Sequence, residues 1–452
     1  MLRPAVTPTW FHVKQLRSAE TIFALSSAPG KSGIAVIRVS GEGAEEAVRG
    51  LTGRVPEPRR ATLTTLRRPK TDEVLDRGLV LWFPAPHSVT GENVAEFHVH
   101  GGRASVASVL DALGGIHGLR PAEPGEFTRR AFEAGKMDLA ETEALADLLD
   151  AETAAQRRQA LRGLEHGIGR KAEAWRERLI QALALAEAEI DFPDEGDVPA
   201  GLAARAAKIA QDLAAEIGLL LAEGAGGERL RDGAVIVIAG PPNAGKSSFL
   251  NRVARREVAI VSPHAGTTRD MLEVTLDLGG YPATLIDTAG LRETGDPIEQ
   301  EALRRARDRA AAADLVLWFE EASEGAAPPP ESAVPLWRIR NKADLAATAS
   351  AHADHMISAL TGEGVDALLA SLAHWLRTEL APAESALVTR ARHRAALIDA
   401  QEHLGRAAVP ESAPELMAEE LRLSARALGR ISGRVDVETV LDAIFSSFCI
   451  GK

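Results

Sequence analysis

The segment "GPPNAGKSS" (240–248) indicates the fold of the central part of this chain, because it contains the complete pattern Gly-x-x-x-x-Gly-Lys-Ser of a phosphate-binding P-loop. The apolar run "AVIVIA" (234–239) precedes it and the helical pattern "SSFLNRVARR" (247–256) follows it. In such a strand–turn–helix unit, backbone N–H groups and the helix N-terminus surround the phosphates. We expect Lys246 to reach the β- and γ-phosphates and Ser247 to ligate Mg²⁺.

Around this loop, short apolar runs alternate with helical patterns from 233 to 380. The runs include "ATLIDTAG" (283–290), "DLVLWFE" (314–320) and "VPLWRIRN" (334–341). This alternation predicts a mostly parallel sheet with helices on both faces.

The sequence "NKAD" (341–344), at the end of the last of these runs, predicts which nucleotide base the site binds. The carboxylate of Asp344 can accept both N–H donors on the Watson–Crick edge of guanine, whereas adenine offers no such pair. Ser358, Ala359 and Leu360 follow a further β-like run, where they can support the base. The combination favours GTP over ATP.

Two segments between these motifs are predicted to sense the γ-phosphate. In "AGTTRD" (265–270), Thr268 is expected to supply a second hydroxyl to Mg²⁺, and in "DTAGLRET" (287–294) Asp287 is expected to hold a metal-bound water. Leu291 occupies the position where many P-loop GTPases have a glutamine, and it can neither donate nor accept a hydrogen bond. Another group must therefore orient the attacking water.

Composition limits the class of protein. The 452 residues are 45% apolar and 26% charged, as in ordinary soluble proteins of two to four domains. No apolar run approaches the roughly 18 residues that a membrane span needs. The net charge of −12 argues against a broad basic coat for nucleic acid, and the single Cys449 suits a reducing compartment, so we expect a cytoplasmic protein. Residues 1–18 are basic, and we favour a disordered tail for them over the alternative of a targeting segment.

The regions outside the nucleotide-binding part differ in their pattern of apolar and polar residues. Residues 19–135 mix β-like runs with a helical pattern and read as α+β, whereas 136–232 and 381–452 have the periodicity of long helices. Two helical segments that flank an α/β module indicate that the module is inserted into one helical domain.

Three separated regions carry a resemblance to a known family. "GPPNAGKSS", "GTTRD", "DTAGLRET" and "NKAD" in this order, the ending "FCIGK" (448–452), and "GEFTRRAFEAGKMDLAETEALADLL" (125–149) resemble the MnmE (TrmE) family of tRNA-modification GTPases. The resemblance extends from about Thr21 to the end of the chain. It implies a Ras-like G domain (233–380) inserted into a discontinuous helical domain (136–232 and 381–452), after an N-terminal α+β folate-binding and dimerisation domain (19–135).

The resemblance also implies an answer to the problem that Leu291 raises. In the family K⁺ takes the place of an arginine finger, and here it would be held by Asn243 and a loop containing Ser262, His264 and Thr267. Glu299 is implied as the residue that orients water, with Glu301 as the alternative. The residues implied for GTP and its switches are Asn243, Ala244, Gly245, Lys246, Ser247, Ser248, Ser262, Thr267, Thr268, Asp287, Thr288, Ala289, Gly290, Asn341, Lys342, Asp344, Ser358, Ala359 and Leu360.

For the N-terminal domain, the resemblance implies that 5-formyl-tetrahydrofolate or a related folate binds Arg38, Glu96, Lys136 and Lys452. It also implies that Cys449 lies near the one-carbon chemistry. Glu96, His98 and His100 alternate along "VAEFHVH" (94–100), so they share one face of a predicted strand. A metal site there is a weaker reading than an exposed polar face.

Members of the family act as homodimers with an FAD-containing partner, MnmG, on carbon 5 of the wobble uridine of tRNA. The same predictions are implied for this chain. Two other classes remain open: a ribosome-assembly GTPase, which would usually carry an RNA-binding module, and a membrane-remodelling GTPase, which would need a membrane-binding element.

Overall fold

A computed structural model describes residues 20–191, 201–223, 226–256, 258–260, 273–287, 313–321, 332–345, 353–381, 383, 386–409, 413–435, 441, 444–445, 448 and 450–451. The chain divides into two compact units, one formed by Met1–Glu143 with Ser432–Lys452 and the other by Ala144–Ile431. Within the described residues, no helix has the length and apolar character needed to cross a membrane.

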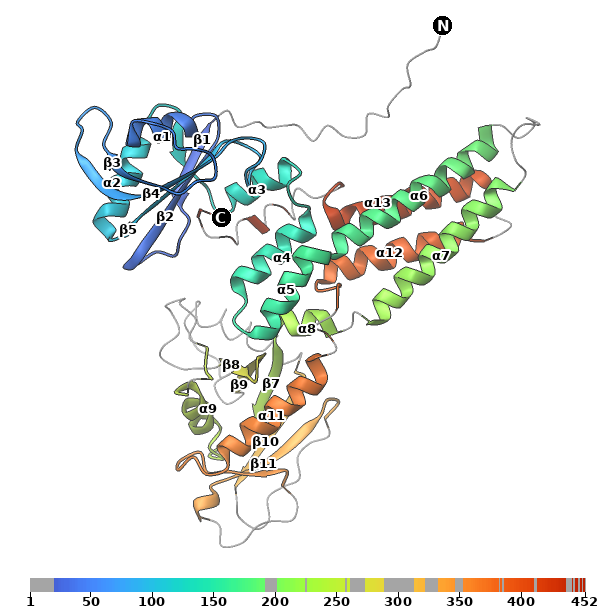
Figure 1. Cartoon of the computed structure of the whole chain (residues 1–452). Coiled ribbons are helices and arrows are strands. Elements are labelled where there is room, and N and C mark those ends of the chain that lie inside the picture. The colour runs from blue at the N-terminus through green and yellow to red at the C-terminus, as the bar shows by residue number, and fades with distance from the viewer. Residues whose placement is uncertain are drawn as a thin grey trace, which may run out of the picture. The chain divides into compact units, whose positions relative to one another are not determined.

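The first unit is built on a six-stranded sheet in the order β3-β4-β5-β2-β1-β6 (Figure 1). All neighbouring strands are antiparallel except β1 and β6, which are parallel. The strands are β1 (Thr21–Leu25), β2 (Ser32–Ser40), β3 (Thr62–Arg67), β4 (Val74–Phe83), β5 (Val94–Gly101) and β6 (Leu119–Pro121).

Three helices belong to this unit, namely α1 (Ala44–Thr52), α2 (Arg103–Gly114) and α3 (Glu126–Glu133). The alternating strand pattern sends Ile37 of β2 and Phe97 of β5 into one core with Val48 of α1 and Leu113 of α2. This sheet with helices matches the α+β class predicted for residues 19–135.

The described residues at the C-terminus pack on this sheet. Ser26 Oγ donates a hydrogen bond of 2.9 Å to the carbonyl oxygen of Gly451, and Pro124 forms an antiparallel bridge with Ile450. Gly451 has φ +99°, and a Cβ there would lie 2.2 Å from the carbonyl oxygen of Leu25, so no larger residue fits without displacing the tail.

Long helices form one part of the second unit. They are α5 (Ala154–His166), α6 (Ile168–Asp191), α7 (Leu202–Glu223), α12 (Ala391–Ala407) and α13 (Pro414–Ser432), while α4 (Leu139–Asp150) crosses the division between the units. Helix α7 packs on both α6 and α12 (Figure 1), and Gln401 of α12 donates to the Ala214 carbonyl of α7. Helices that flank the α/β module in sequence therefore lie side by side.

A second six-stranded sheet, in the order β12-β11-β10-β7-β9-β8, forms the rest of this unit. Its strands are β7 (Ala234–Ala239), β8 (Glu273–Leu278), β9 (Tyr281–Asp287), β10 (Leu315–Glu321), β11 (Leu336–Asn341) and β12 (His355–Met356), and only the β8–β9 pair is antiparallel. The described helices here are α8 (Gly227–Asp232), α9 (Lys246–Ala254), the short η3 (Ala343–Leu345) and α11 (Val365–Leu380).

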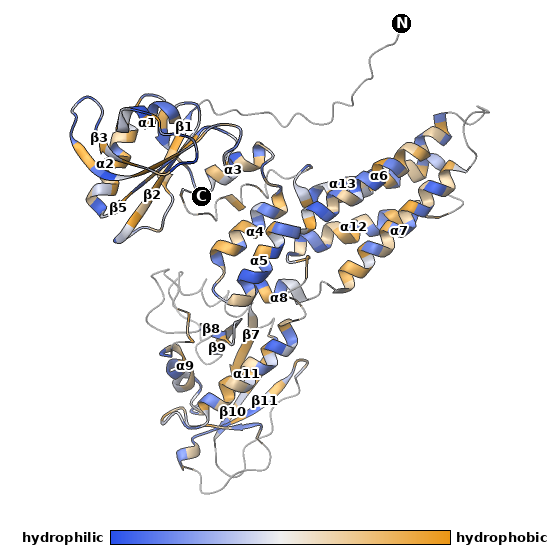
Figure 2. Cartoon of the chain, in the orientation of Figure 1, coloured by the Kyte–Doolittle hydropathy of each residue, from blue (hydrophilic) through white to orange (hydrophobic). Residues whose placement is uncertain are grey.

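The strand β7 is hydrophobic along almost its whole length (Figure 2). Such a continuous apolar run is typical of a parallel strand that is covered on both faces. Ile236, Leu317 and Phe319 are fully buried in the core with Phe249 of α9 and Leu372 of α11. The predicted mostly parallel sheet with flanking helices, and the mixed α/β and α+β fold class, are confirmed.

Candidate functional site

The sequence-predicted nucleotide residues meet at the carboxyl edge of the second sheet. The P-loop follows β7, Asp287 ends β9, and Asn341 ends β11. In the parallel register, Ile238 of β7 lies opposite Asp287. Ligands of open α/β sheets bind at the carboxyl ends of their strands, so this edge is the expected place for the site.

The backbone of the P-loop explains its two required glycines. Gly240 has φ +140°, and a Cβ there would lie 2.1 Å from the carbonyl oxygen of Phe319. Gly245 has φ +86°, and its Cβ would lie 2.1 Å from Nδ2 of Asn341. Asn243 also has a positive φ of 64°, a conformation that asparagine tolerates better than most residues. The two glycines therefore let the loop pass closer to Phe319 and Asn341 than any larger residue would allow.

Lys246 and Ser247 begin α9. Lys246 is only 6% exposed, and its ammonium group donates 2.8 Å hydrogen bonds to the carbonyl oxygens of Gly240 and Pro241. The cation is therefore held against the loop itself, where the β- and γ-phosphates of a nucleotide would attract it. Ser248, the next residue of the helix, is exposed.

A hydroxyl and a carboxylate that suit Mg²⁺ lie side by side. Ser247 Oγ donates a 2.6 Å hydrogen bond to Oδ2 of Asp287, and Asp287 is buried. Hard oxygen donors, together with water and phosphate oxygens, are the ligands that Mg²⁺ prefers. These residues therefore fit the ion that the sequence predicts.

The base-recognition residues are joined to the P-loop by Asn341, which is 2% exposed. Its Nδ2 donates to the Ala244 carbonyl oxygen at 2.7 Å, and its Oδ1 accepts from the Ala359 N–H at 2.9 Å. Lys342 follows with φ +63°, and Asp344 is exposed on η3. The structure thus brings the "NKAD" segment and residues 358–360 together beside the phosphate loop.

The loop that supports the base is closed by its own backbone. The buried Ser358 accepts hydrogen bonds from Gly362 N–H at its carbonyl and from Thr361 N–H at its hydroxyl. Ala359 is buried, whereas Leu360 is 78% exposed. We call residues 358–362 the base loop.

Several predicted site residues lie outside the described residues. They are Ser262, His264, Thr267 and Thr268 of the first switch, Thr288, Ala289, Gly290 and Glu299 after β9, and Cys449 and Lys452 at the C-terminus.

In the first unit, the structure pairs two of the residues predicted for folate. Arg38 of β2 lies opposite Glu96 of β5, and its Nη2 and Nε donate to Glu96 Oε1 at 2.9 and 3.1 Å. His98 Nε2 is 3.2 Å from the second carboxylate oxygen, and the guanidinium lies 5.8 Å from the centroid of the Phe127 ring. Sequence reasoning missed the part played by Phe127, which only the packing of α3 brings near β2.

Lys136 and His100 do not share these contacts. The Lys136 ammonium donates to the Pro86 carbonyl oxygen at 2.6 Å, and His100 Nδ1 is 2.8 Å from Oδ1 of Asp76. Among the residues that the structure describes, no group of three or more His, Cys, Asp or Glu side chains could hold a metal ion.

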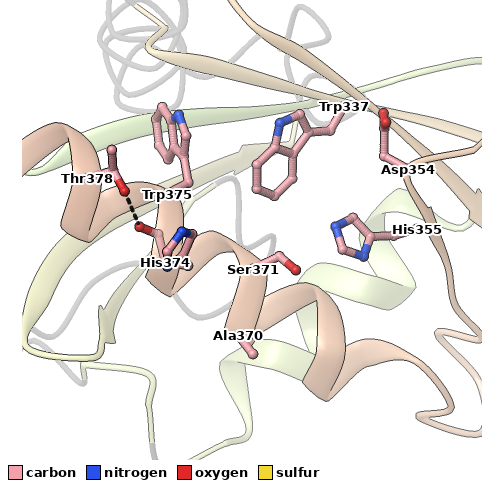
Figure 3. Close-up of a pocket in the computed structure, with 8 residues that line it drawn as sticks. All are labelled: Trp337, Asp354, His355, Ala370, Ser371, His374, Trp375 and Thr378. Atoms are coloured by element: carbon pink, nitrogen blue, oxygen red, sulfur yellow. Dashed lines mark hydrogen bonds between the residues drawn. The ribbon is translucent and has the colours of Figure 1, made fainter.

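A hollow of about 620 Å³ lies elsewhere on the second unit, between α11 and the strands β11 and β12 (Figure 3). Its walls include Trp337 and Trp375, whose rings meet edge to face at 6.4 Å, and His355, whose pKa is lowered by burial. None of the predicted nucleotide residues lines this hollow. Trp337 stands near the start of β11, whereas Asn341 ends that strand, so the hollow is separate from the nucleotide site.

Comparison with known proteins gives two family matches that together span most of the chain. Residues 139–449 match the model of the MnmE helical domain, and residues 21–136 match the GTP-binding protein TrmE N-terminus. The tRNA modification GTPases MnmE of Rhodopseudomonas palustris strain CGA009 and of Parvibaculum lavamentivorans are each 56% identical to this chain. The aligned regions cover 96% of this chain and 99% and 100% of those proteins.

Among solved structures, Aquifex aeolicus Era bound to GDP·AlF₄⁻ is similar, with 26% identity and a TM-score of 0.24 over 37% of this chain and 66% of that chain. A GTP-binding protein from Sulfolobus solfataricus in complex with GDP has 15% identity and a TM-score of 0.22, over 60% and 85% of the two chains.

Proposed function

The chain belongs to the MnmE family of tRNA modification GTPases and is a GTP hydrolase of tRNA modification, and we propose that K⁺ assists its hydrolysis of GTP. We further propose that, with an MnmG-type flavoprotein, it modifies carbon 5 of the wobble uridine of tRNA with a one-carbon unit from a tetrahydrofolate. The observation that carries the GTPase part is the meeting of Lys246, the Ser247–Asp287 pair and Asn341 at one sheet edge.

The protein's own groups support a phosphoryl-transfer site. Lys246 is held by two loop carbonyls, and a γ-phosphate would offer it charged oxygens in their place. Ser247 and Thr268 would bind Mg²⁺ directly and Asp287 would bind it through water, so that the metal neutralises charge on the phosphates. Glu299 would orient the attacking water in place of the side chain that Leu291 lacks.

Asn243 is the residue we propose as the side-chain ligand of K⁺, with Ser262, His264 and Thr267 contributing from the loop of residues 262–268. The Asn243 side chain is exposed on a turn of positive φ, and its amide oxygen is a suitable donor for a monovalent cation. A bound K⁺ would place positive charge near the phosphates where negative charge develops in the transition state.

We expect GTP hydrolysis to be at least about tenfold faster in KCl than in NaCl of equal concentration, because one electrostatic donor at a transition state is commonly worth more than that. Initial rates of phosphate release at saturating GTP and Mg²⁺ measure the effect. The Asn243→Ala variant should lose most of the difference between the two salts. Equal rates of the wild-type protein in both salts would rule out K⁺ assistance.

For the one-carbon donor, we propose that Lys136 and Lys452 attract the carboxylates of the folate and that Glu96, with Arg38 beside it, binds the pterin by accepting its N–H donors. Arg38 and Glu96 are half-buried and 2.9 Å apart, so both would contact the same end of the folate. Cys449 is proposed to act near the one-carbon unit.

The remaining proposals concern organisation. We propose an N-terminal domain of residues 19–135, a helical domain of 136–232 with 381–452, an inserted G domain of 233–380, a homodimer formed through the N-terminal domain, and a cytoplasmic location. The packing of α12 on α7 supports the discontinuous helical domain. A monomeric mass by light scattering at micromolar concentration would contradict the dimer.

We expect deletion of the gene to remove a carbon-5 modification from the wobble uridine, as measured by mass spectrometry of tRNA nucleosides. Wild-type protein should restore the modification, whereas Glu299→Ala should bind GTP yet fail to restore it, since we propose that the modification requires GTP hydrolysis. Unchanged nucleosides with a ribosome-subunit defect would instead indicate an assembly GTPase.

A further inference from the structure

Arg252 stands on α9, two turns after the P-loop, and its guanidinium reaches the base loop. Its Nε donates to the Ala359 carbonyl oxygen at 2.5 Å, and its Nη2 donates to the Leu360 carbonyl oxygen. Two consecutive carbonyls are thus bound by one planar cation, a geometry for which arginine is suited and lysine is not. We propose that Arg252 is a positioning residue that holds the base loop in its guanine-binding conformation and thereby sets nucleotide affinity.

The base loop has two anchors of different kinds. Asn341 binds the Ala359 N–H, and Arg252 binds the carbonyl of the same residue. Asn341 reaches the loop from β11, whereas Arg252 reaches it from the helix that begins at the phosphates. Together they connect the phosphate end of the site to the base end on both sides of Ala359.

Loss of the guanidinium would leave the Asn341 anchor but free the carbonyls of Ala359 and Leu360. The Leu360 side chain is largely exposed and adds little packing, so the loop would keep its own hydrogen bonds at Ser358 and the bond to Asn341 but lose both carbonyl contacts. The loop would then have to be ordered when a nucleotide binds, and that entropy cost would lower the affinity. Chemistry at the γ-phosphate should change little.

The shape of the loop around Arg252 is a second observation. Gly362 has φ +95°, and a Cβ at this position would lie 2.8 Å from Nη1 of Arg252. A substitution there would be strained and would also press on the guanidinium. The conformation of the loop and the position of the arginine are therefore mutually dependent.

A residue just after this helix offers a matched control. Arg256, two residues beyond the end of α9, binds Oδ1 of Asp366 at the start of α11 and has no hydrogen bond to the base loop in the described contacts. Asp366 is 83% exposed, so the pair is solvent-screened and should contribute little to stability. Arg256→Met removes an arginine and its ion pair with Asp366 without touching residues 358–362.

The test compares Arg252→Met, Arg252→Lys and Arg256→Met in the full-length protein. We expect Arg252→Met to raise the dissociation rate of mant-GDP about tenfold, since hydrogen bonds to charged groups are among the stronger ones. The KM for GTP should rise by a similar factor while kcat stays within about twofold. Arg252→Lys should recover part of the affinity, because one carbonyl can still be bound.

Arg256→Met should match the wild type in dissociation rate and KM. The proposal is overturned if Arg252→Met also matches the wild type in both, or if Arg252→Met lowers only the melting temperature. If the chain did not bind guanine nucleotides at all, neither the wild type nor any of the three variants would bind mant-GDP, which distinguishes that outcome from a failure of the Arg252 proposal.

Discussion

The Asp344→Asn variant is expected to prefer xanthine nucleotides to guanine nucleotides. The carboxylate of Asp344 accepts the N1–H and the exocyclic amine of guanine, and the amide of asparagine would meet that amine with its own donor. Xanthine carries a carbonyl oxygen where guanine has the amine, so an amide donor can pair with it. A site built around hydrogen bonds rejects a mismatched ligand by large factors.

The structure indicates that substitution of Asp344 should change the base preference without disturbing the rest of the site. Asp344 is exposed on η3, while the neighbouring Asn341 is buried and holds both the P-loop and the base loop. Substitution of Asp344 should therefore leave the scaffold of the site intact, whereas substitution of Asn341 would not.

We expect kcat/KM for GTP to fall by about 10³-fold or more and kcat/KM for XTP to rise above it, an effect typical of a lost hydrogen-bond pair in a base-reading site. Asp366→Asn, which makes the same charge change near the base loop, should keep the preference of the wild type for GTP. If Asp344→Asn still hydrolyses GTP with nearly wild-type kcat/KM, Asp344 does not read the base.

The second large effect is expected on the stability of the first unit. Arg130 of α3 is only 7% exposed, and its two Nη atoms donate to Glu92 Oε2 at 2.9 Å and to the Glu20 carbonyl oxygen at 3.0 Å. Nη2 also lies 3.3 Å from Oε1 of Glu126, which is 11% exposed. This cation holds α3 to the ends of the N-terminal strands.

Arg130→Met should lower the free energy of unfolding of this unit by about 2–3 kcal/mol, because it removes a charged donor from the Glu20 carbonyl and from the partly buried Glu92 and Glu126 carboxylates. Urea unfolding followed by circular dichroism measures the loss. The adjacent Arg129→Met is the control, since Arg129 is 41% exposed, its ion pair with the similarly exposed Glu133 is 3.6 Å long, and its guanidinium lies 5.6 Å from the centroid of the Phe445 ring. That variant should lose less than about 1 kcal/mol. Equal losses in the two variants would contradict the role of Arg130.

The contribution of Arg130 and Glu126 to the stability of the folded state depends on pH. Burial raises the pKa of Glu126, but the hydrogen bond from Arg120 and further charged contacts outweigh burial, so its pKa is lowered. A lowered carboxyl pKa stabilises the folded state at pH above the unfolded pKa, and that stability is lost as the pH falls through the folded pKa. Arg130→Met should therefore reduce stability near neutral pH more than in acid.

The sequence predicts those features of this protein that depend on residues close together along the chain. The P-loop, "DTAG" and "NKAD" each follow an apolar run, and parallel strands bring their carboxyl ends to one edge, so the order of motifs predicted the meeting of Lys246, Asp287 and Asn341. The glycines of the P-loop can be predicted in the same way, because the backbone geometry that requires them involves only a few neighbouring residues.

The remaining contacts depend on register and packing between distant segments. Arg38 meets Glu96 because β2 and β5 pair in one register, and a shift of one residue would send them to opposite faces. Arg252 resembles any solvated arginine of an amphipathic helix until α9 packs beside the base loop, and Arg130 looks equally ordinary beside Arg129 until α3 docks. The nucleotide chemistry could be predicted from the chain alone, because it requires particular residues at fixed spacing. Which arginines support that chemistry depends on how the helices and strands pack, because the partners of these arginines lie far away in sequence.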